Sequence, residues 1–277
     1  MPAPAQQTGL LFDDIYLRHL AGNTDHPERP ERLIAIRDEL ERTGVLKTLY
    51  RITPRRVTDQ ELELVHKPSY VALVRRELSA VRGFKELSTG DTVVSADSLR
   101  AAEFAAGGVL NVVDAVMAGK VRNAFAAVRP PGHHATPDRG MGFCIFNNVA
   151  IAARYLQKKH GIGRVLIVDW DYHHGNGTQD IFYNDGSVFY FSTHHYGAYP
   201  GTGSAAETGR GPGVGKILNV PRLLVRVTRN SFRLLKEDWF RPLVTSNPIS
   251  SSSAPASTAC ATTCLACSIL PRKVSLP

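Results

Sequence analysis

The chain has 277 residues, of which 43% are hydrophobic and 21% are charged, as in an ordinary globular protein. This composition excludes a wholly disordered chain, a collagen and a coiled coil. No stretch approaches the roughly 18 uninterrupted apolar residues of a membrane-spanning helix, and the N-terminus lacks the basic region and apolar run of a secretion signal. We therefore expect a soluble protein that is not secreted and has no membrane partner.

The net charge of +8 lies mostly after residue 221. From Arg222 onward there are eight basic and two acidic residues, which leaves +2 for the rest of the chain. Three of the four cysteines also lie there, so Cys144 is alone in the body. A single body cysteine fits a reducing compartment, the cytoplasm or the nucleus, and the weak charge of the body gives no reason to expect direct nucleic-acid binding.

Helical patterns come first in chain order. A helix is predicted over 29–43, where Gly44 fits a left-handed stop. A second, Ala-rich helix is predicted from an N-cap at Ser95 towards Gly119. A third is predicted over 147–160 and is closed by Gly161.

Short apolar runs alternate with these helices, which predicts an α/β protein. Each run is flanked by Gly, Pro or Asp, as buried parallel strands are. The runs are 124–128, 164–168, 188–192 and 216–220. The Gly-rich stretch 197–215 is predicted to be a long loop, because no helix-forming run follows its glycines.

The run Val-Leu-Ile-Val-Asp169-Trp-Asp171-Tyr-His173-His174 has polar residues where an apolar strand ends. Open parallel sheets place ligands at that end of a strand. Asp171 and His173 are two apart, so they point the same way on an extended segment. Together they offer a carboxylate oxygen and an imidazole nitrogen to a divalent metal such as zinc. The alternative is that they are loop caps and surface polar groups.

A second strand end carries Arg129-Pro-Pro-Gly-His133-His134. The Pro-Pro-Gly turn is rigid, so both imidazoles could be directed into one cleft. Histidine titrates near neutral pH, which suits the pair to general base and general acid work. An incidental His-His pair is the alternative, and the second polar strand end argues against it.

The segment 140–148 leads into the third predicted helix and contains Phe143 and Cys144. No Cys, Lys or Arg adjoins Cys144 to favour a thiolate, so we expect a small buried residue rather than a nucleophile.

These motifs resemble the zinc-dependent histone deacetylase family, and most closely its class II and bacterial deacetylase-like branch, which includes acetylpolyamine amidohydrolases. The resemblance covers 8–221. It is carried, in the family's order, by His26-Pro-Glu-Arg-Pro-Glu-Arg-Leu33, Asp91-Thr, Arg129-Pro-Pro-Gly-His-His134, Gly142-Phe-Cys-Ile-Phe-Asn-Asn148, Asp169-Trp-Asp-Tyr-His-His-Gly-Asn-Gly-Thr178 and Tyr199-Pro-Gly-Thr-Gly203. It implies the family's three-layer α/β/α sandwich around a parallel sheet, like that of arginase.

The resemblance also implies a zinc-dependent hydrolase. Asp171 and His173 match two of the three zinc ligands, and His133 and His134 match the tandem catalytic histidines. A zinc-activated water would attack the acetamide, and the products would be acetate and a free amine.

Further roles follow for the residues around the histidines. Asp169 matches the carboxylate that orients His133, and Asn176 stands where this branch places the partner of His134. Asp169 and Ser192 also resemble positions of a structural monovalent-cation site, which implies a bound K⁺.

The substrate channel is the last feature that the resemblance implies. Phe143 and Tyr199 match its aromatic walls, with Gly142 beside them, and Asp91 matches the rim residue that holds the substrate backbone. The expected partner is an acetylated protein such as a histone, or an acetylated polyamine.

Residues 222–277 lose this resemblance, and the third zinc ligand and the oxyanion-stabilising Tyr of the family are missing. A shift of the reading frame accounts for the loss. Over 245–258 the shifted codons permit Phe-Lys-Pro-Asp-Leu-Val-Leu-Ile-Ser-Ala-Gly-Phe-Asp, and over 222–231 they permit Pro-Ala-Gly-Ser-Gly-Asp-Glu-Glu-Phe, both typical of the family.

We therefore expect a catalytic domain over 8–221, incomplete at its C-terminus, and a disordered, out-of-frame tail over 222–277. On this interpretation the tail's Cys-x3-Cys-x2-Cys is not a metal site. Three hypotheses remain open: a deacetylase acting on acetyl-lysine, an amidohydrolase acting on acetylated polyamines, and a catalytically silent truncated isoform. An arginase-like dinuclear hydrolase would need additional Asp and His ligands.

Overall fold

The computed structural model describes residues 7–223, so the expectations for the tail lie almost wholly outside the described residues. The strands are β1 (Thr8–Leu11), β2 (Tyr50–Ile52), β3 (Lys85–Glu86), β4 (Val93–Val94), β5 (Asn123–Ala126), β6 (Val165–Asp169), β7 (Val188–His195) and β8 (Ile217–Arg222). The helices are α1 (Glu31–Arg42), α2 (Asp59–Leu62), α3 (Pro68–Ser79), α4 (Ser98–Met117), α5 (Asn148–His160) and α6 (Asn176–Phe182), with short 3-10 helices η1 (Asp14–Arg18), η2 (Val45–Thr48) and η3 (Gly211–Gly213).

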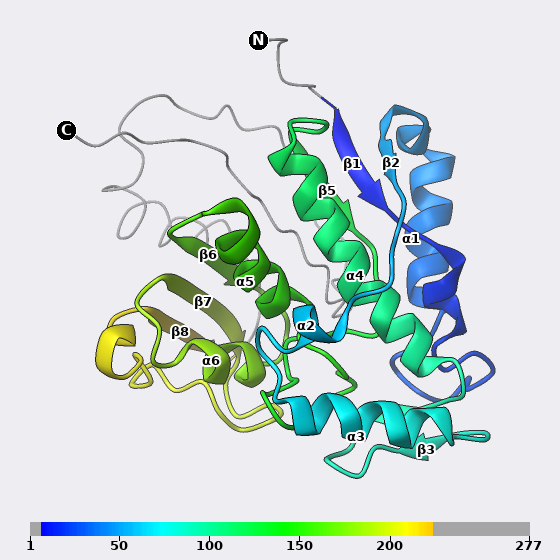
Figure 1. Ribbon diagram of the computed structural model, residues 1–277. Helices are drawn as coiled ribbons and strands as arrows, with labels where there is room; N and C mark the ends of the chain where they lie inside the picture. Colours follow the sequence, from blue (N-terminus) through cyan, green and yellow to red (C-terminus); the bar gives the residue numbers. More distant parts are fainter. Residues whose placement is uncertain (1–6, 224–277) are drawn as a thin grey trace.

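The strands form two parallel sheets of three strands each, in the orders β2-β1-β5 and β6-β7-β8, and an antiparallel pair, β3-β4. Figure 1 shows the first sheet beside α4 and the second beside α5 and α6. The parallel pairing confirms the predicted α/β class, and β5 to β8 correspond to the four predicted runs. The short strands β1 and β2 were not predicted.

The ends of the helices follow local capping chemistry. Asn147 caps α5 by accepting a hydrogen bond from the Ala150 amide, and Gly161 ends it with a φ of 66°. Gly44, with a φ of 73°, follows α1 in the same left-handed conformation. The predicted cap at Ser95 was wrong: α4 begins after Asp97, and the Ser95 hydroxyl instead accepts a hydrogen bond from the Leu20 amide.

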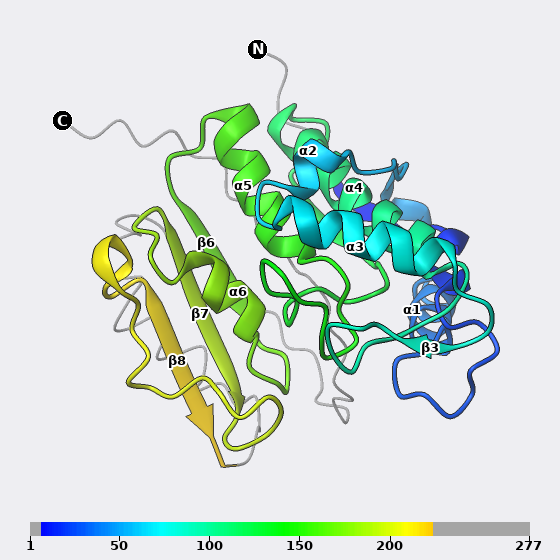
Figure 2. The same cartoon turned by 60° about the horizontal axis from the view of Figure 1, so that its bottom comes forward.

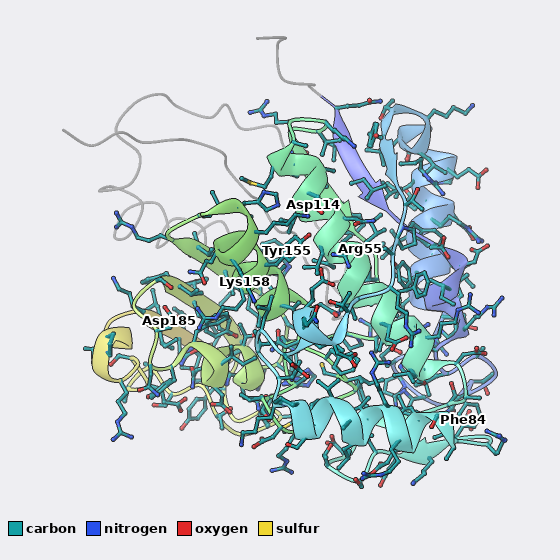
Figure 3. All side chains as sticks on the ribbon, in the orientation of Figure 1. Arg55, Phe84, Asp114, Tyr155, Lys158 and Asp185 are labelled. Atoms are coloured by element: carbon teal, nitrogen blue, oxygen red, sulfur yellow. The ribbon has the colours of Figure 1, made fainter. Side chains whose placement is uncertain are left out.

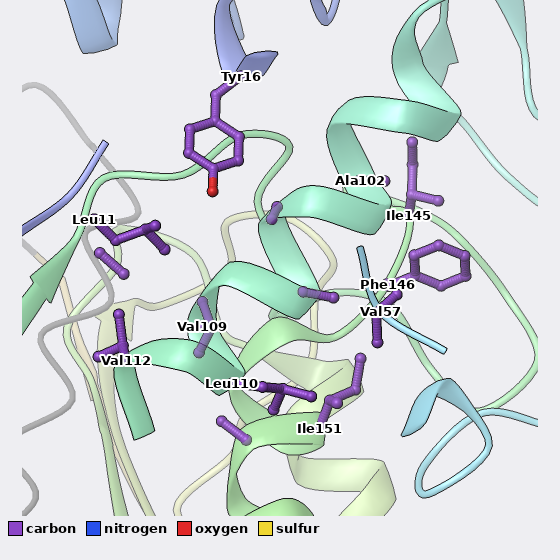
Figure 4. Packing of buried hydrophobic residues seen from close by; sticks show 14 of the residues in the cluster. Leu11, Tyr16, Val57, Ala102, Val109, Leu110, Val112, Ile145, Phe146 and Ile151 are labelled. Atoms are coloured by element: carbon purple, nitrogen blue, oxygen red, sulfur yellow. The ribbon is translucent and has the colours of Figure 1, made fainter. Parts of the chain in front are cut away.

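The larger hydrophobic core surrounds α4 (Figure 4). The buried residues of α4 are mostly Ala, Gly and Val, so neighbouring elements can pack closely against several sides of this helix. Leu110 of α4 is fully buried in this cluster, together with Ile145 and Phe146 from the segment before α5. The core therefore anchors the loop that carries the site residues around Phe143.

A polar contact joins α4 to α5 on the outer surface (Figure 3). The Tyr155 hydroxyl donates to Asp114 at 3.0 Å, and His160 Nε2 lies 2.8 Å from the same carboxylate. The two helices are neighbours along their length, so they connect the two parts of the molecule that carry the separate sheets.

The described residues leave the edges of the two parallel sheets unpaired and one face of the second sheet only partly covered. Figure 2 shows the strands of the second sheet side by side. Within residues 7–223, the outer strands of the two parallel sheets, β2, β5, β6 and β8, are each paired along only one edge. On β6 and β8 the side chains facing α5 and α6 are packed, whereas on the opposite face Leu166 is 40% exposed and Val168, Leu218 and Val220 are half-buried. Parallel sheets are normally covered on both faces. Among the described residues no helix has the length and apolarity of a membrane span.

We predict that Gly107→Ala destabilises the protein although α4 is a helix. A Cβ at Gly107 would lie 2.2 Å from the Arg55 carbonyl oxygen and 2.6 Å from the Val57 amide nitrogen, and backbone cannot move aside as a flexible side chain can. Overpacking of about 1–3 kcal/mol then exceeds the helix-propensity gain of about 1 kcal/mol. Urea unfolding should show a lower free energy of unfolding.

Gly163→Ala is the matched control, because nothing lies within 4 Å of a Cβ there. Its free energy of unfolding should change by no more than about 0.5 kcal/mol. Equal effects of the two substitutions would contradict the close approach of α4 to the 55–57 backbone.

Candidate active site

Polar residues from the loops after β5 and β6 meet beyond the carboxyl ends of these strands. His133 Nδ1 lies 3.0 Å from Asp169 Oδ2, and its ring centroid is 4.0 Å from that of His134. Both histidines are almost fully buried. The structure therefore brings together the two strand ends that the sequence singled out.

His134 has a partner of a different kind. Its Nδ1 lies 2.8 Å from Asn176 Oδ1, at the first residue of α6. An amide oxygen can only accept a hydrogen bond, so Nδ1 of His134 carries the proton and donates a hydrogen bond to Asn176. Nε2 of His134 is then left with a free lone pair.

Asp171 and His173 lie next to this pair of histidines. His173 Nδ1 is 3.4 Å from Asp171 Oδ1, and His133 Nε2 is 3.9 Å from the same oxygen. The ring centroids of His134 and His173 are 5.9 Å apart. The described residues contain no group of three or more His, Cys, Asp or Glu side chains placed to hold a metal ion.

The two buried histidines have pKa values displaced in opposite directions. Burial lowers the pKa of His133, but the charge of Asp169, its hydrogen bond and the charge of Asp171 outweigh burial and raise it to about 9. Burial, and then the charge of His133, hold the pKa of His134 well below 6.5. One imidazole is therefore protonated at neutral pH and its neighbour is neutral.

A cavity of about 540 Å³, here called the mouth cavity, opens beside these groups. Its lining comprises Gly90, Asp91, Arg139, Met141 and residues 197–201. The Tyr199 ring stands edge-on to that of His134, with centroids 5.0 Å apart, so this wall extends from the cavity to the histidines.

The surroundings of the His134 ring also depend on two residues with positive φ. Gly142 has a φ of 55°, and a Cβ there would lie 2.4 Å from the His134 ring. Phe143 has a φ of 68°, a conformation unusual for a bulky residue, and its ring meets that of His26 edge-on at 4.8 Å. The Gly142 amide donates to Asp91 at 2.7 Å, and the Tyr199 hydroxyl donates to the same carboxylate at 3.3 Å.

The other predicted residues have the following surroundings. Asp169 and Ser192 are register partners on β6 and β7, and the Ser192 hydroxyl lies 2.9 Å from His194 Nδ1. Cys144 is buried and burial raises the pKa of its thiol, which fits the predicted small buried residue.

Buried residues that hold the site residues in place by hydrogen bonds were not predicted from the sequence. The Tyr190 hydroxyl donates to Asp169 Oδ2 at 2.9 Å. His66 donates from Nδ1 to the Thr136 carbonyl at 3.0 Å and accepts at Nε2 from the Asn147 amide at 2.9 Å. Burial lowers the pKa of His66 to about 4, so it remains neutral. No local pattern marks such residues, because their partners lie far away in sequence.

A network of hydrogen bonds starts at His174, the residue that follows the metal-ligand candidate His173. His174 Nδ1 contacts Thr202 Oγ1 at 2.8 Å, and Nε2 contacts Gln179 Oε1 at 3.0 Å. Gln179 lies on α6, the helix that begins with Asn176. This network therefore links the Gly-rich loop that carries Tyr199 to the helix that holds His134.

Comparison with known proteins gives consistent matches. The model of the histone deacetylase domain family matches residues 26–248. The chain is 44% identical over 204 residues to the polyamine deacetylase HDAC10 of Homo sapiens, covering 70% of this chain and 30% of that protein. It is 42% identical over 216 residues to a probable deacetylase of Archaeoglobus fulgidus, covering 77% of this chain and 58% of that protein.

Two further matches come from Arabidopsis thaliana histone deacetylase 15 and a solved structure. The chain is 44% identical to the former over 221 residues, covering 77% of this chain and 39% of that protein. The crystal structure of the HDA15 HD domain superposes with a TM-score of 0.78 at 39% identity, covering 86% of this chain and 68% of that one. The chain thus spans less than two thirds of the length of the three curated relatives.

The pKa of His133 should depend on Asp169. In Asp169→Asn we expect it to fall from about 9 to 6.5 or below, because burial persists after the main opposing charge is removed. In the parent, the stability that this pair contributes is fully present below pH 6.5 and is lost as the pH rises through about 9. Imidazole NMR titration of the metal-free protein measures the shift.

Asp138→Asn serves as the control for loss of a carboxylate, since Asp138 pairs with Lys67 and not with His133. It should leave the His133 midpoint unchanged. An unchanged midpoint in Asp169→Asn as well would contradict the assigned cause.

Proposed function

The chain belongs to the histone deacetylase domain family, and we propose that its domain is a zinc-dependent deacetylase that hydrolyses the acetamide of acetyl-lysine in histones or other proteins. The observation that carries the proposal is the pair of adjacent buried histidines whose pKa values are displaced in opposite directions. Such a separation provides one base and one acid at neutral pH. Acetylated polyamines are the alternative substrate, favoured by the similarity to HDAC10.

The family is zinc-dependent, and two donors of this chain fit that ion. Two ligand atoms at about 2.0–2.2 Å from a tetrahedral centre lie about 3.4 Å apart. Asp171 Oδ1 and His173 Nδ1 are 3.4 Å apart. In the metal-free site hydrogen bonding to His173 and the charge of His133 outweigh burial and lower the pKa of Asp171, so this residue is a carboxylate. To bind zinc, His173 Nδ1 would be unprotonated and would no longer donate to Asp171. When bound, zinc would polarise the acetamide carbonyl and a water molecule.

The remaining chemistry falls to the chain's own side chains. Nε2 of His134 is unprotonated, so it can take a proton from the attacking water. Protonated His133, held by Asp169, places positive charge beside the developing oxyanion and can pass a proton to the leaving amine. The products are acetate and the free amine.

The channel walls would align the substrate. Phe143 and Tyr199 supply apolar ring surface for the lysine methylenes, and the Gly142 amide fixes Asp91 at the rim. Preorganisation of this kind lowers the ordering cost of binding.

Catalysis by this chain depends on a third ligand. Catalytic zinc sites have three protein ligands, and the described residues supply two. We propose that residues 222–277 are out of frame and that the restored frame supplies an Ala-Gly-Phe-Asp segment. The family model itself matches as far as residue 248.

The test compares the 277-residue chain with a frame-restored chain. We expect the restored chain to hydrolyse a fluorogenic acetyl-lysine peptide, and the present chain to bind zinc at least about 100-fold more weakly and to be inactive. Calorimetric zinc titration and the fluorogenic assay measure these differences. Asp171→Ala in the restored chain should abolish both zinc binding and turnover.

Sequencing the transcript across the codons for 219–226 accompanies this test. Confirmation of the present tail in a functional message would refute the frame proposal. Zinc-dependent turnover by the present chain would show that some other group completes the site.

A further inference from the structure

The mouth cavity has two charged side chains in its lining, Asp91 and Arg139. They differ in how many of their polar atoms already make hydrogen bonds within the protein. Asp91 Oδ1 accepts hydrogen bonds from the Gly142 amide and the Tyr199 hydroxyl, so contacts within the wall engage one of its two carboxylate oxygens. Arg139 Nε donates to the Thr89 carbonyl at 3.1 Å. Among residues 7–223, its two terminal nitrogens make no hydrogen bond and no ion pair.

The backbone that carries Arg139 is held in place. The Gly140 amide donates to Thr89 Oγ1 at 3.0 Å, and that hydroxyl lies 3.2 Å from the Gly140 carbonyl oxygen. With the Gly142–Asp91 bond, these contacts join the segments 89–91 and 139–142 into one wall. The guanidinium is therefore anchored at Nε, while its terminal nitrogens remain available to a ligand.

We infer that Arg139 is a specificity-determining residue that selects acetyl-lysine flanked by acidic residues, and selects against acetylated polyamines. The inference rests on the proposed function, whose site it deepens. A guanidinium matches a carboxylate through two parallel hydrogen bonds. The carboxylate of an Asp or Glu beside the acetyl-lysine would bind the terminal nitrogens as the acetyl-lysine side chain enters past Tyr199.

The same charge acts against a polyamine. An acetylated polyamine keeps at least one ammonium group at neutral pH, and a rim suited to it would carry carboxylates free to bind that cation. The guanidinium of Arg139 lines the same cavity as Asp91, so its positive charge opposes the attraction of an entering ammonium group to that carboxylate. Like charges placed at a binding site repel the wrong partner.

The test is fluorescence anisotropy with the 277-residue chain and with the frame-restored chain, each with and without zinc. Two labelled acetyl-lysine peptides are used, one flanked by Glu and one flanked by Lys, with N8-acetylspermidine as competitor. We expect the Glu-flanked peptide to bind about three- to fivefold more tightly, as for an exposed ion pair. The preference should shrink in 0.5 M salt because screening weakens the pair.

Two variants and a control test whether Arg139 causes the preference for the Glu-flanked peptide. Arg139→Gln should abolish the preference, and Arg139→Glu should reverse it and improve competition by the acetylated polyamine. Arg82→Gln is the control, because Arg82 also has a single hydrogen bond, to the Val81 carbonyl, but lines a different cavity. It should bind both peptides as the parent does. Circular dichroism shows that each variant is folded.

The outcomes separate the two proposals. If Arg139→Gln keeps the preference, or the parent binds N8-acetylspermidine better than either peptide, the inference about Arg139 is wrong and deacetylation stands. If neither the 277-residue chain nor the frame-restored chain, folded and with zinc, binds any of the three ligands, the proposed function fails and the inference fails with it.

Discussion

The arrangement of the site depends on the hydrogen bonds that the Asp169 carboxylate accepts. It stands at the end of β6 and accepts three hydrogen bonds, from His133, from the Tyr190 hydroxyl and from the Asp171 amide. Each bond fixes a different part of the site: an acid–base group, the neighbouring strand and the segment with the metal-ligand candidates. Gly175 passes so close to this carboxylate that a Cβ would lie 2.3 Å from Oδ2. At this position the chain therefore packs backbone, rather than a side chain, against the carboxylate.

A second constraint keeps the neighbouring loops in register. His66 and Asn147 hold the segment after His134 to the start of α5, and the Asn147 side chain also donates to the Ala135 carbonyl at 3.0 Å. Because burial keeps His66 neutral, this connection does not change over the pH range in which a free histidine titrates. The loop that follows the two catalytic candidates is thus held by a contact that does not titrate with them.

Much of this arrangement could be predicted from the sequence, and the reason is its locality. The strand before His133 and the strand before Asp169 are apolar runs, and parallel strands bring their carboxyl ends to one side. The Asp171–His173 pair could be predicted because its geometry depends on a two-residue spacing. The cap of α4 was misjudged because Ser95 is drawn into contacts with Leu20 and Ser98, which no local pattern reveals. Tyr190 was missed because its role depends on strand register, and the specificity of Arg139 depends on a neighbour fifty residues away in the chain.

The outer strands of the two parallel sheets have a consequence for where further chain can add. An open edge exposes unpaired amide and carbonyl groups that can pair with an extended chain. Among the described residues β2, β5, β6 and β8 each have such an edge, and the exposed, apolar Leu166 lies on β6. These edges are therefore the places where an extended segment, from the rest of this chain or from another chain, would join either sheet as a further strand.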